Sequence, residues 1–170
     1  SGGLVLVLPL EAATLVAAQR RDDDLIVAVS DGRRLAVDAM ELATAPLGKL
    51  AERFSGYDAW GAYVLGPVAL LMREGRAVPK GLRLLVSSTV PQGKGLGSSA
   101  AVEVAVLRAT AACLGVDASA RRLALLGQRA EQVFAAAPCG PMDQLAVMCG
   151  EAGSLLPILC RPGEILEALP

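Results

Sequence analysis

The sequence predicts an α+β fold, and three observations support this prediction. Short apolar segments and a hairpin signal fill the N-terminal part of the chain. Segments with helical spacing dominate from residue 60 onward, with two further short strands between and after them. A glycine-rich loop at 92–99 joins a predicted strand to a predicted helix. Strands first, followed by helix–strand–helix–helix–strand, is an order typical of the α+β class.

The N-terminal part is expected to be mostly β-sheet. Short apolar runs bounded by turn residues predict four strands, at residues 4–8, 12–19, 25–29 and 33–37. The first run is continuously apolar, which predicts a buried strand. The charged run 20–24 is expected to be a solvated turn. Asp31 and Gly32 separate the last two strands and favour the positive φ angles of a tight hairpin turn.

The remainder of the chain alternates between helices and strands. Apolar residues at helical spacing, bounded by capping or breaking residues, predict helices at residues 60–74, 100–114, 119–134 and 142–148. Gly115 is placed to cap the C-terminus of the second helix, and Ser119 the N-terminus of the third. Strands are predicted at 82–86 and 155–160.

Composition excludes several classes of function. The chain has 170 residues, the length of one domain, and a net charge of −1, which argues against a nucleic-acid partner. It contains no His, which excludes His-based acid–base chemistry and His-ligated zinc. The longest uncharged apolar stretch, 59–72, is shorter than the roughly 20 residues of a bilayer span. We therefore expect a cytoplasmic protein with no membrane partner.

The cysteines indicate a reducing compartment. The chain has four of them, with no C-x-x-C pair, at Cys113, Cys139, Cys149 and Cys160. This spacing fits reduced, buried thiols better than a zinc site or a disulfide framework. Cys139 lies beside a Gly-Pro break, where a helix dipole would lower the pKa of its thiol. No base accompanies it, so a nucleophilic role is not expected.

The glycine-rich loop is the sharpest candidate for a binding site. Gly93, Gly95 and Gly97 alternate between a predicted strand and a predicted helix, so the backbone can approach a ligand closely. The positive end of the helix dipole makes this loop a cradle for an anion such as phosphate, and Ser98 and Ser99 add hydroxyls for a phosphate or its magnesium ion. The loop has neither the G-K-[ST] ending of a Walker A motif nor the glycine spacing of a Rossmann fingerprint. The alternative is a tight turn in which a serine caps the helix.

Four further residues have a structural interpretation, and a functional one is also open for Asp143 and Glu131. Asp143 follows a Gly-Pro break and is either a proton acceptor or a first-turn helix carboxylate. Glu131 is either a magnesium ligand or an exposed helix charge. Glu103 is explained by compensation of the helix dipole in the first turn. Trp60, the only tryptophan, is explained by core packing.

Taken together, these segments resemble the GHMP kinase superfamily and, within it, the galactokinase and L-arabinokinase branch. Residues 90–101 (VPQGKGLGSSAA) are similar to the phosphate-binding motif of the superfamily. Residues 138–144 (PCGPMDQ) are similar to the galactokinase segment that carries the catalytic aspartate, and 60–66 resemble a helix of the same branch. The resemblance implies a GHMP N-terminal domain over residues 1–170, with a mixed sheet packed against helices as in ribosomal-protein domain 2.

The resemblance also implies roles for individual residues. The ATP phosphates would be wrapped by the loop residues Gly93, Lys94, Gly95, Leu96, Gly97, Ser98, Ser99, Ala100 and Ala101. Ser99 and Glu131 would hold Mg²⁺, and Asp143 would activate or orient the anomeric hydroxyl of a sugar. Gly140 would approach that sugar through its backbone, and Trp60 would lie near the adenine. Pro141 departs from the branch, which usually has an aliphatic residue there.

The function expected from this resemblance is ATP- and magnesium-dependent phosphorylation of the C1 hydroxyl of L-arabinose or galactose. The alternatives are another GHMP small-molecule kinase, a non-catalytic sugar and ATP sensor, or an inactive structural domain. The family's catalytic arginine and sugar-gripping acids are expected before Ser1, and its C-terminal GHMP domain after Pro170. Because 54% of the residues are hydrophobic, we expect this chain to self-associate when it is separated from that domain.

Overall fold

The computed structural model describes residues 3–75, 80–161 and 163–169. Its larger sheet has the strand order β2-β5-β3-β4, and these strands span Thr14–Arg21, Gly81–Ser88, Leu25–Ser30 and Arg33–Asp38 respectively. Strands β3 and β5 are parallel, whereas the β2–β5 and β3–β4 pairs are antiparallel. The predicted α+β architecture with a mixed sheet is therefore confirmed.

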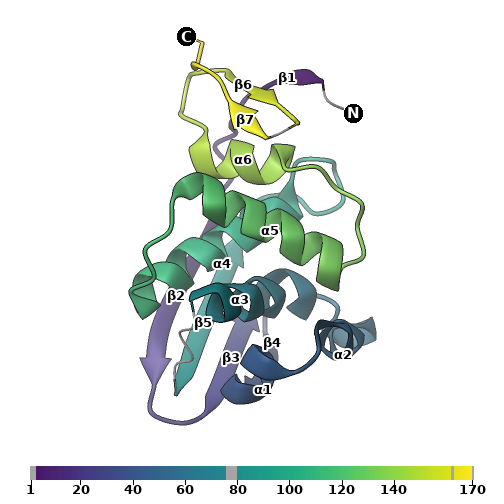
Figure 1. Ribbon diagram of the computed structural model, residues 1–170, viewed down its shortest axis with the longest axis vertical. Helices are drawn as coiled ribbons and strands as arrows, with labels where there is room; N and C mark the ends of the chain where they lie inside the picture. Colours follow the sequence, from purple (N-terminus) through teal and green to yellow (C-terminus); the bar gives the residue numbers. More distant parts are fainter. Residues whose placement is uncertain (1–2, 76–79, 162, 170) are drawn as a thin grey trace.

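Helices α3 (Gly61–Gly75) and α4 (Ser98–Leu114) cover one face of this sheet, and α5 (Ala120–Phe134) packs on these two helices (Figure 1). The main hydrophobic core lies between them and the inward-facing sheet residues. Gly66 of α3 allows a close approach to α5, because a Cβ there would lie 2.6 Å from the ring of Phe134.

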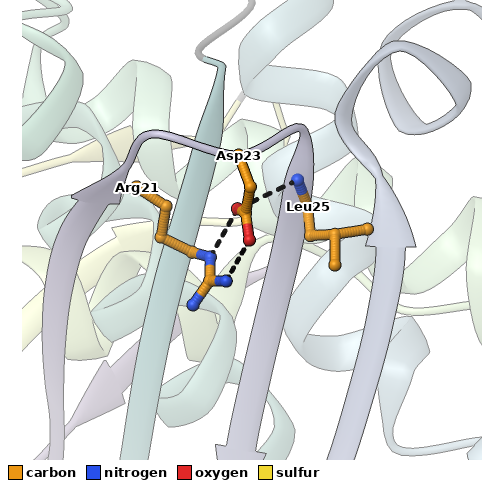
Figure 2. A network of polar contacts seen from close by, with 3 residues as sticks. All are labelled: Arg21, Asp23 and Leu25. Atoms are coloured by element: carbon orange, nitrogen blue, oxygen red, sulfur yellow. Dashed lines mark hydrogen bonds and ion pairs between the residues drawn. The ribbon is translucent and has the colours of Figure 1, made fainter.

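The sheet turns at both predicted places, but the charged turn is shorter than predicted, because Arg20 and Arg21 belong to β2 and only residues 22–24 lie between β2 and β3. Asp31 and Gly32 have φ angles of 47° and 73°, as the Asp-Gly hairpin signal predicts. The charged segment after β2 is held by a fork in which the Arg21 Nε atom donates to Asp23 Oδ1 at 2.7 Å (Figure 2). The Arg21 Nη2 atom pairs with the second oxygen of Asp23, and the Leu25 amide donates to the first.

A second, smaller sheet lies at the opposite end of the molecule from this turn (Figure 1). It has the strand order β1-β6-β7, and these strands span Leu4–Val7, Leu156–Leu159 and Glu164–Ile165. Helix α6 (Met142–Cys149) packs beside it over a small apolar cluster that includes Leu145 and Ile158. The strand predicted at 4–8 is present as β1, but the prediction that it is buried is wrong: Leu4, Leu6 and Leu8 are each more than half exposed, since α6 covers only one face of this sheet.

Short elements between β4 and α3 were not predicted. Helices α1 (Ala39–Thr44) and α2 (Leu47–Arg53) and a 3₁₀ turn, η1 (Gly56–Asp58), lie here. Asp38 caps α1 by accepting a hydrogen bond from the Glu41 amide. The Arg73 guanidinium of α3 donates to the carbonyl oxygens of Leu42 and Ala45, so tertiary contacts fix this segment.

Two broader predictions concern the thiols and the membrane. The four cysteines are free thiols, as expected, but each is partly exposed, so the prediction that they are buried is wrong. Among the described residues, no helix is long and apolar enough to cross a bilayer.

Candidate active site

The glycine-rich loop between β5 and α4 forms a concave backbone surface. Gly93, Gly95 and Gly97 have φ angles of 67°, 69° and 66°, in the left-handed region that favours glycine. No atom lies within 4 Å of a Cβ built on Gly93 or Gly95, so the space beside the backbone is open. Alternation of left-handed residues with others turns successive N–H groups toward one side, a geometry that binds anions.

The start of α4 completes this surface. The N-cap of the helix is Gly97, and among the described residues no side chain hydrogen-bonds to this helix end. The alternative in which a serine caps the helix is therefore wrong, and Ser98 and Ser99 are the first two helical residues. The unpaired first-turn N–H groups and the helix dipole point at whatever occupies the loop.

The loop lines two open cavities. The larger, the Asp143 cavity, has a volume of about 1120 Å³ and is lined by Gly95, Leu96, Gly97, Arg108 and Asp143, among others. The smaller, the Trp60 cavity, has a volume of about 460 Å³ and its lining includes Trp60, Tyr63, Gly93, Ser98 and Ser99. The arrangement places an anion cradle between two hollows, and Asp143 lines the larger of them.

Asp143 stands in the first turn of α6, directly against the glycine loop. A Cβ on Gly97 would lie 3.5 Å from the Cβ, Cγ and Oδ2 atoms of Asp143. Burial and, to a lesser degree, the charge of Glu131 raise the pKa of the Asp143 carboxyl. A carboxylate with a raised pKa is a better proton acceptor than an ordinary exposed aspartate.

Glu131 of α5 is linked to α6 by a hydrogen bond from the buried side-chain amide of Gln144. The Gln144 Nε2 atom donates to Glu131 Oε2 at 2.8 Å and to Glu103 Oε2 at 3.0 Å. Glu131 lines neither cavity, but its charge raises the pKa of Asp143 and of Tyr63, which line one cavity each. Glu131 is half-buried, so it is not the exposed helix charge of the structural interpretation.

The interpretation of Glu103 as a carboxylate that compensates the helix dipole is also wrong. Glu103 is fully buried in α4 rather than placed in the first turn to compensate the dipole. Burial raises the pKa of the Glu103 carboxyl to about 9, so it is a neutral acid near pH 7.

Trp60 lies at the edge of the main core and also lines the Trp60 cavity. The Arg33 guanidinium lies 5.3 Å above its ring, a cation–π contact. Arg33 lines the same cavity. Core packing and a ligand-facing position thus coexist at this residue.

Three residues of interest lie apart from the cavities. Lys94 is exposed at the tip of the loop and lines neither cavity. Gly140 is exposed, with open space beside its Cα atom, and its sugar contact stays a prediction. The pKa expected for Cys139 is wrong in direction: burial and the charge of Glu131 raise the pKa of its thiol to about 11.

Sequence reasoning missed the buried hydrogen bonds from Gln144 to Glu103 and Glu131, and, separately, the contact of Arg33 with the Trp60 ring. Gln144 stands next to Asp143 in the chain, and Glu103 lies four residues beyond Ser99. Both are polar residues within otherwise apolar helical segments, which is the signal that identifies them.

The chain is similar to known kinases. Residues 62–151, more than half of the chain, match the family described as GHMP kinases N terminal domain. L-arabinokinase of Arabidopsis thaliana is 49% identical over 108 residues, which are 63% of this chain and 10% of that protein. Galactokinase of Roseiflexus sp. is 35% identical over 159 residues, 94% of this chain and 38% of that protein. The chain thus spans well under half of the length of these relatives.

Solved structures share the fold. The crystal structure of Lactococcus lactis galactokinase complexed with galactose matches with a TM-score of 0.85 at 24% identity, over 99% of this chain and 42% of that one. A mevalonate kinase matches with a TM-score of 0.80 at 16% identity, over 98% of this chain and 50% of that one. The family match, the sequence relatives and the fold agree: the chain belongs to the GHMP kinases and carries their N-terminal domain.

Proposed function

We propose that the protein containing this chain is a sugar 1-kinase, which transfers the γ-phosphate of ATP to the anomeric C1 hydroxyl of L-arabinose or galactose. The observation that carries the proposal is the contact between Asp143 and Gly97, which sets a carboxylate against the anion cradle. The names of the relatives, L-arabinokinase and galactokinase, support the substrate class.

We assign the nucleotide to one cavity and the sugar to the other. The backbone from Gly93 to Ala101 would bind the ATP phosphates, and Trp60 would contact the adenine in the Trp60 cavity. The sugar would occupy the Asp143 cavity. The C1 oxygen attacks the γ-phosphorus, the bond to the β,γ-bridging oxygen breaks, and the hydroxyl proton passes to the Asp143 carboxylate.

Ser99 and Glu131 fit a magnesium ion. Hydroxyl and carboxylate oxygens are the hard ligands that Mg²⁺ prefers, and Glu131 has no cationic partner among the described residues. No group of three or more His, Cys, Asp or Glu side chains suited to a metal forms in the described part of the chain. The ion would therefore take most of its ligands from phosphate oxygens and water, and it would neutralise charge on the transferred group.

The test is phosphate transfer by the full-length protein from ATP to a panel of galactose, L-arabinose, glucuronate and mevalonate. We expect transfer to one of the first two sugars, with the product phosphorylated at C1. Transfer to mevalonate and to none of the sugars would show that the protein is a different GHMP kinase. Tight sugar binding without transfer to any member of the panel would overturn the kinase assignment in favour of a sensor.

A further inference from the structure

The side-chain amide of Gln144 joins three helices at one buried point. It donates from α6 to Glu103 of α4 and to Glu131 of α5, at 3.0 Å and 2.8 Å. Gln144 and Glu103 have no exposed surface. Each of the three helices also carries a part of the candidate site: Asp143 on α6, the cradle at the start of α4, and Glu131 itself on α5.

This buried polar network costs more folding free energy than apolar packing at the same place would cost. The Oε1 atoms of both Glu103 and Gln144 are buried without a hydrogen-bond partner among the described residues. Each such atom carries a desolvation cost, whereas apolar side chains of similar shape would pack without one. Packing alone therefore does not account for a glutamine at this position.

The backbone of α5 makes room for the same group. A Cβ on Gly127 would lie 3.3 Å from the Gln144 Cγ atom and 3.6 Å from the Glu103 Cβ atom. A glycine inside a helix costs about 1 kcal/mol relative to alanine. The helix thus tolerates a weak helix former at the position that faces the amide.

We infer that Gln144 is a positioning residue, whose amide fixes the Glu131 carboxylate toward the magnesium site and holds α6, with Asp143, against the phosphate cradle. The inference rests on the proposed function. The amide engages one oxygen of Glu131, which orients the carboxylate and leaves Oε1 outside the amide contact. Partners of this kind orient metal-binding side chains, and their loss typically costs roughly 10–100-fold in metal affinity or activity.

The test replaces Gln144 by Met in the full-length protein, with Gln132→Met as the matched control. Gln132 of α5 also donates its amide across to the segment before α6, at 2.8 Å to the Cys139 carbonyl, but it touches no carboxylate. ADP binding is measured by calorimetry with and without Mg²⁺, together with kcat and KM for the sugar. We expect Gln144→Met to weaken the Mg²⁺-dependent part of ADP binding and to lower kcat by roughly 10–100-fold, with ADP binding without Mg²⁺ and the sugar KM little changed.

A second variant separates positioning from stability. Glu103→Met/Gln144→Met replaces both partners by apolar side chains of similar length, which removes the desolvation cost and preserves folding. We expect it to be as stable as the wild type and still defective in Mg²⁺-dependent ADP binding. Full Mg²⁺-dependent binding and full kcat in either variant would overturn the positioning role while leaving the kinase assignment intact. A wild-type protein that binds ADP with a Mg²⁺ dependence but phosphorylates no sugar would overturn the kinase assignment alone.

Discussion

The Asp143 carboxyl group lies against the backbone of Gly97, at 3.5 Å from the position that a Cβ atom would take there. Gly97 is the last glycine of the loop and Asp143 lies in the first turn of α6, so two segments far apart in the sequence meet at one point. Because Gly97 is the N-cap of α4, the carboxylate stands beside the helix end that would bind phosphate. A hydroxyl activated by Asp143 is therefore adjacent to the group that it would attack.

Replacement of Asp143 by Asn should abolish transfer without loss of nucleotide binding. The amide keeps the shape of the side chain but cannot accept the hydroxyl proton, and the loss of a general base costs about 10²–10⁴-fold in kcat. The measurement is turnover with the active sugar beside ADP affinity by calorimetry. Turnover of Asp143→Asn equal to that of the wild type would remove Asp143 from its assigned role.

Replacement of Gly97 by Ala should reduce both stability and function. Its φ of 66° strains any residue with a Cβ by about 1–2 kcal/mol. Gly115→Ala is the matched control, because Gly115 caps the other end of the same helix at a φ of 71° with open space around it. We expect similar losses in unfolding free energy for the two variants, but weaker ATP binding only for Gly97→Ala. Equal ATP binding in both variants would contradict a phosphate-binding role for Gly97.

The sequence predicts the elements whose signals are local and misses those that depend on tertiary contacts. The Asp31-Gly32 hairpin and the Gly115 and Ser119 caps follow from local chemistry, and all are present. Helices α1 and α2 have only 6 and 7 residues, too few for a clear apolar period, and Arg73 from α3 helps to hold the segment between them.

The candidate site likewise combines features that local sequence signals predict with features that depend on tertiary packing. The glycine spacing identifies the cradle, because left-handed backbone is a property of the loop itself. The burial of Glu103 is not visible in the sequence, since α4 is apolar around most of its circumference and periodicity does not indicate which side faces α6. The role of Gln144 likewise depends on how three helices pack.

Stability should fall with rising pH because of Glu103. Its pKa is 4.5 in an unfolded chain and about 9 when buried, so between these values the folded state keeps a proton that the unfolded state has released. The free energy of unfolding therefore decreases as pH rises through this range. Glu103→Gln cannot ionise, and its thermal midpoint relative to the wild type should increase from pH 5 to pH 9. The exposed Glu52 supplies the control Glu52→Gln, which should show no such increase. A constant difference between Glu103→Gln and the wild type across this range would show that Glu103 does not retain its proton.

Replacement of Gly66 by Ala should destabilise the packing of α3 on α5. The new Cβ would lie 2.6 Å from the Phe134 ring, which is itself buried and packs edge-to-face against Phe54 at 5.9 Å. A buried ring with that contact has little room to retreat, and overpacking of this kind costs about 1–3 kcal/mol. Gly48→Ala is the control, since Gly48 lies in α2 with no atom within 4 Å of its Cβ position, and alanine there should stabilise by up to about 1 kcal/mol. Chemical denaturation of both variants measures the two effects, and a Gly66→Ala variant as stable as the wild type would mean that the two helices separate at no cost.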